Sequence, residues 1–499
     1  MGQPAAAAPS PASVSRDALL YLPGRAIPAV VQILTVTVLT AFFSSEEIGR
    51  YELSMRFMLF LATVSALWLS MSVLRLHAEH DKEGREAGFL RVLLATRNVA
   101  LGLGLAAGGA VYCWGPDSLF GSYRDLLPGA LFAFAAYGSF EIGLSVLRAR
   151  RRPMAYSLAT SINALCRLPL AMLLFTVFGF DISGMLWALG AMYLVAYALL
   201  VWPRVRPAPD AGQQGMTTAE RQAIRTGLLA YGIPILGTQL LNFFVNNLDR
   251  YLIKLYEGDM AVGLYAVASN LVEQPMVLVF QTYALAVIPS VSACWERQGR
   301  AATETLGAGV TRVFLLVCVP LLALLAAGAP HIFAVLARGE SAAAASVAPW
   351  LALASFVYGL TYLANLGLHL AKRTGLLLAL TAVALAVNLL ANVLLIPRFG
   401  HEGAGMARLL SNLLMVAMFA AAGARYLRWR VGGWSLARIL AAGLATAATL
   451  YVLAPYLPQT FWGLVPLMAA GVVVYPLVLL ITGEVNLRDL DRIRARGRG

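Results

Sequence analysis

Polar residues recur at helical spacing inside long apolar segments of this sequence. Gln239, Asn242 and Asn246 step by three and four residues, and Asp249 or Arg250 continues the series on the same face. Residues three or four positions apart lie on one side of a helix, so the series predicts a polar stripe. Amide groups donate and accept hydrogen bonds, as sugar hydroxyl groups do. A stripe that faces water would therefore suit a carbohydrate ligand.

A second polar stripe is predicted by Tyr358, Tyr362, Asn365 and His369, which have the same spacing. Polar residues on membrane helices also hold helices together, at about 0.6 kcal/mol per contact. For a single Asn this explanation is sufficient. Stripes on several helices of one half of the chain favour the wall of a water-filled cavity instead.

Arginine is frequent within the apolar segments. Six arginines lie there, namely Arg25, Arg56, Arg97, Arg167, Arg312 and Arg408. A charge at the centre of a membrane helix costs about 2.5–3.5 kcal/mol, so such residues normally face an internal aqueous path. Those near a helix end, such as Arg312, can instead extend to the membrane surface. Arg167 is the deepest, and its two interpretations are a cavity wall and a buried ion pair with Glu141. The excess of buried Arg over buried acid indicates an anionic ligand.

The elements that must hold these residues are membrane helices. The chain has 499 residues, of which 60% are hydrophobic and only 13% are charged, whereas a soluble protein has about 25% charged residues. Many apolar runs reach the roughly 20 residues that cross a bilayer. The first run is too long for a signal-peptide core, so we expect it to be retained. About fourteen spans are predicted, at 26–43, 51–74, 92–112, 125–147, 154–178, 184–202, 226–248, 260–289, 307–330, 347–370, 375–396, 402–424, 436–456 and 460–482.

Basic residues set the predicted orientation. With a cytoplasmic N-terminus, most of the 38 Lys and Arg residues fall in cytoplasmic segments, including the run Arg150–Arg152. The positive-inside rule therefore places both termini in the cytoplasm. The net charge of +13 is explained by these topology determinants beside anionic lipid. Nucleic acid is not an expected partner, because no basic stretch outside the membrane is interleaved with stacking aromatics.

The chain also repeats its own pattern. The octet FGFDISGM at 178–185 returns as FGHEGAGM at 399–406, and RRP at 151–153 returns as KRT at 372–374, each 221 residues later. EEIGRYELS at 46–54 resembles MAVGLYAVAS near 260–269, which pairs Gly49 with Gly263. Because the matches keep their order, we infer a duplicated unit of six spans. An even number of spans gives a parallel repeat, an arrangement of alternating-access transporters.

Three segments resemble the polysaccharide transporters of the multidrug/oligosaccharidyl-lipid/polysaccharide exporter superfamily. They are LTAFFSSEEIGRYELSMRFMLFLATVSA, NLDRYLIKLYEGDMAVGLYAVASNLVEQP and AVNLLANVLLIPRFGHEGAGMARLLSN, which frame most of residues 25–425. The resemblance implies an all-α membrane protein with two parallel six-helix lobes that form a V around a central cavity. Two C-terminal helices beyond the lobes fit the fourteen-helix members. The expected parts are a cytoplasmic tail (1–24), an N-lobe (25–203), a cytoplasmic linker (204–222), a C-lobe (223–430), two further spans (431–483) and a basic tail (484–499).

The resemblance also implies a function. It implies that the protein flips polyprenyl-diphosphate-linked oligosaccharide repeat units across the bacterial inner membrane by alternating access, for surface polysaccharide assembly. The implied partners are this lipid-linked substrate, membrane lipids and a polysaccharide polymerase or export machinery. No cofactor or metal is expected, and the energy source is H+, Na+ or the membrane potential. Asp249, Glu273 and Glu141 are the candidate coupling residues.

The expected site combines the arginines with the polar stripes. Arginine forks bind phosphate oxygens bidentately, and tyrosines and amides contact sugars. We expect Arg56, Arg167 and Arg250 to hold the diphosphate at successive stages. The residues assigned to diphosphate or sugar are Arg25, Arg56, Arg167, Arg250, Gln239, Asn242, Asn246, Tyr358, Tyr362 and Asn365.

Two other functions stay open. A drug/cation antiporter of the same superfamily would need unpaired acids in its cavity, and Glu141 and Glu273 are the deep candidates. A membrane enzyme of glycan assembly would need a substantial extramembrane loop, whereas no predicted outer loop exceeds roughly a dozen residues. The four Cys have no CxxC spacing and the five His are scattered, so no metal site is predicted.

Overall fold

The computed structural model describes residues 23–117, 121–207, 216–429 and 432–485, and the regular elements in these ranges are all helices. Twelve helical segments are long and apolar enough to cross a membrane. Two of them, α12 (Asp259–Ala327) and α16 (Thr374–Gly423), each contain two helices joined at a non-helical glycine, Gly299 and Gly400. Fourteen crossing segments result, which confirms the predicted all-α membrane protein. The predicted tails at 1–24 and 484–499 lie largely outside the described residues.

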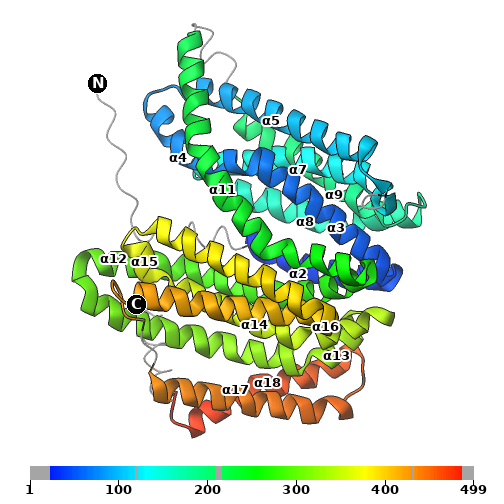
Figure 1. Cartoon of the computed structure of the whole chain (residues 1–499), viewed down its shortest axis with the longest axis vertical. Helices are drawn as coiled ribbons and strands as arrows, with labels where there is room; N and C mark the ends of the chain where they lie inside the picture. The colour runs from blue at the N-terminus through cyan, green and yellow to red at the C-terminus, as the bar shows by residue number, and fades with distance from the viewer. Residues whose placement is uncertain (1–22, 118–120, 208–215, 430–431, 486–499) are drawn as a thin grey trace. The chain divides into compact units, whose positions relative to one another are not determined.

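The other elements are short connectors or single spans (Figure 1). In chain order they are α2 (Pro23–Phe42), α3 (Ser45–Ala62), η1 (Thr63–Leu67), α4 (Trp68–Lys82), α5 (Glu86–Trp114), η2 (Gly121–Tyr123), α7 (Leu127–Ala149), α8 (Pro153–Thr176), α9 (Ser183–Ala196), η3 (Tyr197–Val201), α10 (Trp202–Val205), α11 (Thr218–Glu257), α13 (Ala329–Leu336), η4 (Gly339–Ser346), α14 (Ala348–Ala364), α15 (Leu366–Leu370), α17 (Gly433–Leu453), η5 (Ala454–Tyr456) and α18 (Phe461–Ile481). Both η1 and η3 are π-helical turns that continue a span.

The backbone conformation shows the internal repeat independently of the sequence matches. Residues with left-handed backbone recur at equivalent points of the two halves, in the turns between spans. The pairs and their φ values are Gly84 (68°) with Gly299 (74°), Arg151 (52°) with Lys372 (56°), and Gly179 (67°) with Gly400 (59°). Gly179 and Gly400 occupy the same position of the repeated octet, where a glycine adopts positive φ without steric cost. The octet is therefore the turn that joins the fifth and sixth spans of each half.

Packing divides the chain into two compact units. The first comprises Met1–Gln32 and Arg50–Asn247, and the second comprises Ile33–Gly49 and Leu248–Gly499. The helices α2, α3 and α11 therefore each contribute to both units. These units follow packing rather than chain order, so the expected lobes at 25–203 and 223–430 remain a prediction.

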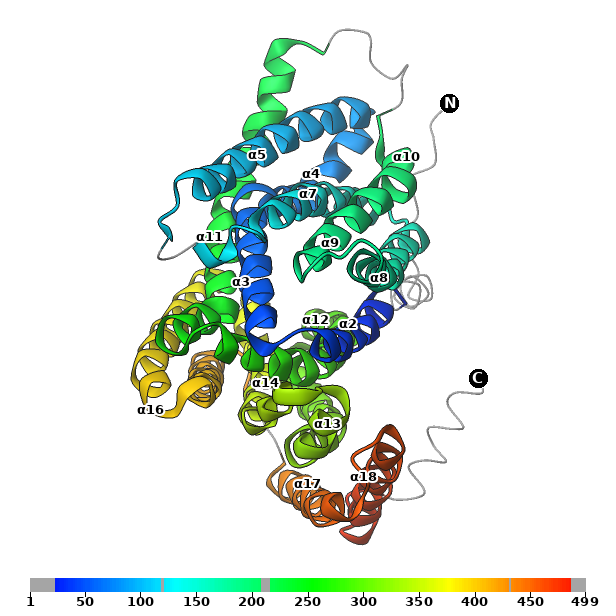
Figure 2. The same ribbon diagram turned by 90° about the vertical axis from the view of Figure 1, so that its right-hand side faces the viewer.

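The first unit is built around α7. This helix packs against α4, α5 and α9 and lies between α5 and α9 in Figure 2. Ala130, Ala133 and Phe134 of α7 are completely buried. Small residues let membrane helices approach closely, and Gly138 of α7 faces Leu101 of α5 at a distance that leaves no room for a methyl group.

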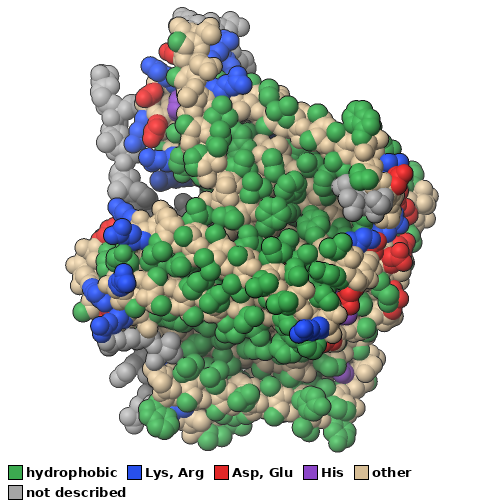
Figure 3. Space-filling view, viewed as in Figure 1, with side chains coloured by type: hydrophobic (Ala, Val, Ile, Leu, Met, Phe, Trp, Pro, Cys, Tyr) green, Lys and Arg blue, Asp and Glu red, His purple; other side chains and the backbone are tan. Residues whose placement is uncertain are grey.

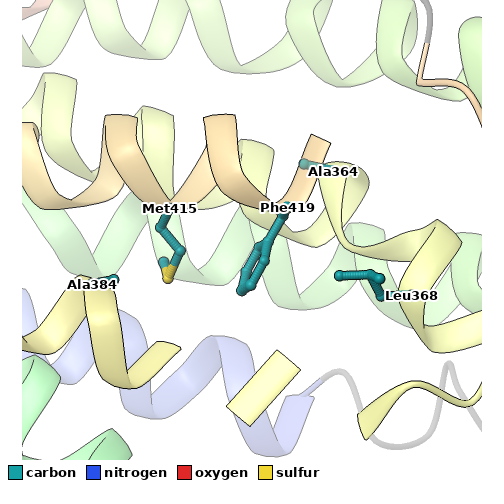
Figure 4. Packing of buried hydrophobic residues seen from close by; sticks show 5 residues of the cluster. All are labelled: Ala364, Leu368, Ala384, Met415 and Phe419. Carbon is teal, nitrogen blue, oxygen red and sulfur yellow. The ribbon is translucent and has the colours of Figure 1, made fainter. Parts of the chain in front are cut away.

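The second unit is built around α14, which packs against both α12 and α16. Figure 4 shows Ala364, Leu368, Ala384, Met415 and Phe419 converging from α14, α15 and α16. The last two spans pack on each other, and α17 also packs on α12, where Gly443 faces Val319. Arg312 of α12 donates from Nε to the Glu484 carboxylate (2.6 Å), which also accepts from the Ser435 hydroxyl. An ion pair thus ties the end of α18 to α12.

The surface agrees with a membrane location. Figure 3 shows hydrophobic side chains over most of the visible face. Large apolar residues such as Leu103, Leu444 and Ile481 are 67%, 72% and 75% exposed. Exposing such side chains to water is unfavourable, whereas exposing them to the hydrocarbon of a membrane costs little. The chain is therefore a multi-pass membrane protein.

Candidate functional site

Buried charges gather in the second unit where α11, α12 and α16 meet. Asp249 and Arg250 of α11 are each 3% exposed. The Arg250 backbone N–H donates to Asp249 Oδ1 (2.9 Å), and its Nη2 donates to Ser269 Oγ (2.7 Å). The Arg250 guanidinium also lies 5.4 Å from the ring centre of Tyr265. The contacts hold Arg250 inside the unit.

The same cluster includes a second arginine. Arg408 of α16 donates from Nη1 to Glu273, and the same atom lies 3.7 Å from Asp249 Oδ2. The Tyr265 hydroxyl donates to the same Asp249 oxygen, Oδ2. We call Asp249, Arg250, Tyr265, Glu273 and Arg408 the charge cluster. It contains two cations and two carboxylates, and is formally neutral.

A neutral polar network adjoins the charge cluster on α16. The Arg408 carbonyl accepts from Ser411 Oγ (3.0 Å), and Ser411 Oγ in turn receives the Asn388 amide (3.1 Å). Asn392 donates to Asn388 Oδ1 (3.0 Å), while its own Oδ1 is buried without a hydrogen-bond partner in the part of the chain that the structure describes. Sequence reasoning missed Ser269, Ser411 and Asn392. Their signal is spacing by four, as in Tyr265–Ser269–Glu273 and Asn388–Asn392.

In the first unit, Arg167 of α8 has a different environment. Its Nη2 donates to Gln32 Oε1 of α2 (3.2 Å). It also interacts electrostatically with the hydroxyl groups of Tyr51 and Tyr193. The alternative ion pair with Glu141 is not formed between these described side chains, and Glu141 of α7 interacts electrostatically with Arg148 instead. Arg167 is therefore a half-buried cation whose hydrogen-bond partner is a neutral amide.

The other arginines of the first unit differ in their pairing. Arg56 donates from Nε to Glu52 Oε1 (2.9 Å), one helical turn earlier on α3, and Glu52 is 4% exposed. Arg97 donates hydrogen bonds to the Tyr197 hydroxyl and to the Asn98 side-chain carbonyl, both of which are neutral. Arg25 forms no ion pair with any described carboxylate and lies on α2 near Tyr156 of α8. Arg25 and Arg167 thus both lie where α2 and α8 face each other, with Arg25 near the start of α2 and Arg167 beside Gln32, two turns later on that helix.

The predicted polar stripes divide between the units. Gln239, Asn242 and Asn246 belong to the first unit, where the Asn246 amide donates to the Asn242 carbonyl of its own helix (2.7 Å). Tyr358 and Tyr362 of α14 belong to the second unit, with ring centres 5.8 Å apart and edge to face. Tyr358 lies near Arg408, so the tyrosine pair borders the charge cluster.

Asn365 follows the end of a helix, whereas Pro275 lies inside one. Asn365 ends α14, and its carbonyl accepts the N–H groups of Leu368 and His369 that open α15. α12 stays helical through Pro275, and its non-helical residue is Gly299. No group of three or more potential metal ligands occurs among the described residues.

Comparison with known proteins defines the class and then the family. The fold matches that of the lipid II flippase MurJ in an inward closed conformation, with a TM-score of 0.77, 15% identity, and coverage of 95% of this chain and 99% of the other. It also matches multidrug resistance MATE transporters of the MOP (multidrug/oligosaccharidyl-lipid/polysaccharide) superfamily. The inward-facing one has a TM-score of 0.60 at 15% identity, covering 85% of this chain and 98% of the other. The outward-facing one has a TM-score of 0.58 at 14% identity, covering 86% and 95%.

The fold is therefore one that MurJ and these MOP-superfamily transporters also have. The family model described as polysaccharide biosynthesis protein matches residues 14–295, more than half of the chain. The chain belongs to this polysaccharide biosynthesis protein family. No curated protein sequence is a significant match.

Proposed function

We propose that this protein translocates a polyprenyl-diphosphate-linked oligosaccharide repeat unit from the cytoplasmic to the outer leaflet of a bacterial inner membrane, for surface polysaccharide assembly. Membership of a polysaccharide biosynthesis family supports this role, as does a fold shared with a lipid II flippase. The observation that carries the proposal is Arg167, a cation within a membrane-spanning helix whose bonded partner is a neutral amide. The protein acts as a transporter by alternating access, not as an enzyme, and both of its termini are cytoplasmic.

Arg167 suits a phosphate group of the diphosphate. Arginine and phosphate commonly form a bidentate pair with two parallel N–H···O bonds between opposite charges, whereas Gln32 accepts one bond from Arg167, so a phosphate competes well with the Gln32 amide. Tyr51 and Tyr193 add hydroxyl groups beside the same guanidinium. Arg25 lies near the start of α2, at the predicted cytoplasmic end, and would meet the diphosphate first.

Arg56 and Arg250 have a different part in the proposal. Both already bond carboxylates, Glu52 and Asp249, so each must release an acid before it can hold a phosphate. We assign the main phosphate contact to Arg167 and treat Arg56 and Arg250 as residues that exchange partners during the cycle. The sugar contacts fall to Gln239, Asn242, Asn246, Tyr358, Tyr362 and Asn365.

The charge cluster is the proposed energy-coupling element. Glu273 and Asp249 each face Arg408, so a proton or Na+ taken up by either carboxylate would release part of that arginine. Removing one charge from a buried network is costly unless another charge replaces it. Ion binding there would therefore favour a rearrangement of α12 and α16. Glu141, which interacts with Arg148 in the first unit, is a second such group.

The proposal is tested by deleting the gene and locating the lipid-linked oligosaccharide. Complete glycan should accumulate on the cytoplasmic leaflet, where impermeant glycan-modifying reagents cannot reach it in intact spheroplasts. Normal glycan with altered sensitivity to cationic drugs would instead support the antiporter, whose fold is shared with the MATE transporters. Loss of the lipid-linked intermediate would indicate an enzyme of its assembly. Either of these outcomes overturns the flippase.

A further inference from the structure

A groove of ≈ 1100 Å³ lies between the two arms of α12, which span 259–298 and 300–327. At one end the arms meet where the Tyr283 hydroxyl donates to the Val310 carbonyl, and the Tyr283 ring lies 5.5 Å from that of Phe314. At the other end Gly299 turns the chain with φ of 74°. Between these points the arms separate. The groove belongs wholly to the second unit, and no residue of the charge cluster lines it.

The groove combines an apolar wall with basic residues. Its described lining includes two arginines, Arg297 and Arg312, and no acidic residue. Arg297 is exposed and forms no ion pair with any described side chain. Arg312 bonds Glu484 through Nε and Nη2 but keeps 46% of its side chain exposed. Its Nη1 has no hydrogen-bond partner among described residues. The lining therefore retains positive charge that no carboxylate of the lining cancels.

The position of the groove also restricts its occupant. The turn of α12 carries Arg297 and Arg300, and basic side chains gather at the end of the second unit where α12 turns (Figures 1 and 3). By the positive-inside rule this end faces the cytoplasm. The groove thus runs from the headgroup level into the hydrocarbon, along Val287, Leu306 and Val313. Its volume of ≈ 1100 Å³ slightly exceeds the roughly 300–1,000 Å³ of a small-molecule site.

We propose that this groove binds one anionic phospholipid of the cytoplasmic leaflet. The phosphate lies at the arginines, and an acyl chain fills the apolar space between the arms, which water fills unfavourably. Basic pockets between membrane helices on the cytoplasmic side bind anionic headgroups in this way. A free phosphate would use the arginines but leave the apolar wall uncovered. The bound lipid would bridge the two arms and, through Arg312 and Glu484, support the contact of α12 with the last two spans.

Two glycines on one arm provide a matched test. Gly307 and Gly309 both have open space where a Cβ would lie, but Gly309 lines the groove and Gly307 does not. Gly309→Leu should fill the groove, while Gly307→Leu makes the same chemical change outside it. The full-length protein is reconstituted in nanodiscs that contain phosphatidylglycerol and phosphatidylcholine, and retained lipids are counted by native mass spectrometry. Wild type and Gly307→Leu should keep one phosphatidylglycerol, and Gly309→Leu should lose it.

The charge requirement has its own pair of variants. Arg297→Gln should weaken the preference for phosphatidylglycerol about fivefold, the effect of one basic residue near an anionic surface. Arg425→Gln removes an exposed arginine outside the groove and should leave the preference unchanged. Equal retention of phosphatidylcholine, or an unchanged lipid count in Gly309→Leu, overturns the proposal. Displacement by inorganic phosphate, or retention of a polyprenyl diphosphate instead, also overturns it. None of these readouts requires the flipping activity.

Discussion

Arg167 of the first unit and the two arginines of the charge cluster in the second unit are held in opposite ways. In the second unit, Arg250 and Arg408 lie among Asp249 and Glu273, and the charge cluster is neutral. In the first unit, Arg167 bonds an amide and faces two phenols. Balanced charges stabilise one another and offer little to an incoming anion, whereas a cation without a carboxylate keeps its attraction for a ligand. Under the proposed function, pairing with a carboxylate rather than depth in the membrane distinguishes the structural arginines from the one that binds the ligand.

The internal repeat makes the contrast sharper. The position equivalent to Arg167, 221 residues later, is Asn388. Asn388 bonds Ser411 and Asn392 in a buried neutral network. Equivalent helices of the two halves thus share a backbone arrangement but differ in charge, with a cation in one and a neutral amide in the other.

The largest expected effect comes from unbalancing the charge cluster. Arg408→Gln leaves Glu273 without its arginine, and it should lower the free energy of unfolding by about 3–5 kcal/mol. Thermal unfolding in detergent, followed by tryptophan fluorescence, measures the loss. The double variant Arg408→Gln with Glu273→Gln removes both charges and should recover most of the stability. If the double variant is as unstable as the single one, the two residues do not act as a pair.

In the first unit, replacing the half-buried Arg167 should lower the transport activity and leave the stability unchanged. Arg167→Ala leaves no carboxylate without an ion-pair partner, so the unfolding temperature should stay close to that of wild type. Translocation of a polyprenyl-diphosphate lipid in proteoliposomes should fall about 10- to 100-fold, the effect of losing a hydrogen bond to a charged group. Arg167→Lys should restore part of the rate, because it keeps the charge but loses the planar fork. Full translocation by Arg167→Ala would remove Arg167 from the site.

A contact between repeat-equivalent residues predicts a smaller effect. Gly49 and Gly263, paired by the repeat, pack on each other where α3 and α12 begin. A Cβ on Gly49 would lie 1.9 Å from the Asp259 carbonyl oxygen, and one on Gly263 would lie 1.8 Å from that of Ser45. Either Gly→Ala change should therefore cost about 1–3 kcal/mol of stability through overpacking. Gly237→Ala, which meets open space on α11, is the control and should not destabilise. Tolerance of alanine at both positions would show that the helices separate easily there.

Sequence alone predicted the spans, the repeat and the depth of Arg167, because each depends on hydropathy or on order along the chain. Ion pairs depend on how helices rotate against one another, which spacing does not specify across helices. For that reason the ion pair of Arg408 with Glu273, which lies 135 residues away, could not be predicted from the sequence. The Glu52–Arg56 pair on one helix was readable from its spacing by four but was missed. The ion pair of Arg312 with Glu484 involves a residue beyond the end of α18, where sequence offers no periodic signal.

The smallest expected effect tests whether the phenols beside Arg167 contribute to its role. Tyr193→Phe keeps the ring, which lies 5.1 Å from that of Tyr137, and removes only the hydroxyl group near the guanidinium. Translocation should fall about three- to tenfold, the value of one ordinary hydrogen bond. Tyr137→Phe removes a hydroxyl from the adjoining ring, which has no interaction with Arg167 in the described structure, and should leave the rate unchanged. If both variants lose the same activity, the aromatic pair supports the fold of the first unit. If only Tyr193→Phe does, the phenol hydroxyl belongs to the anion site, and the contrast between the two units extends beyond the arginines.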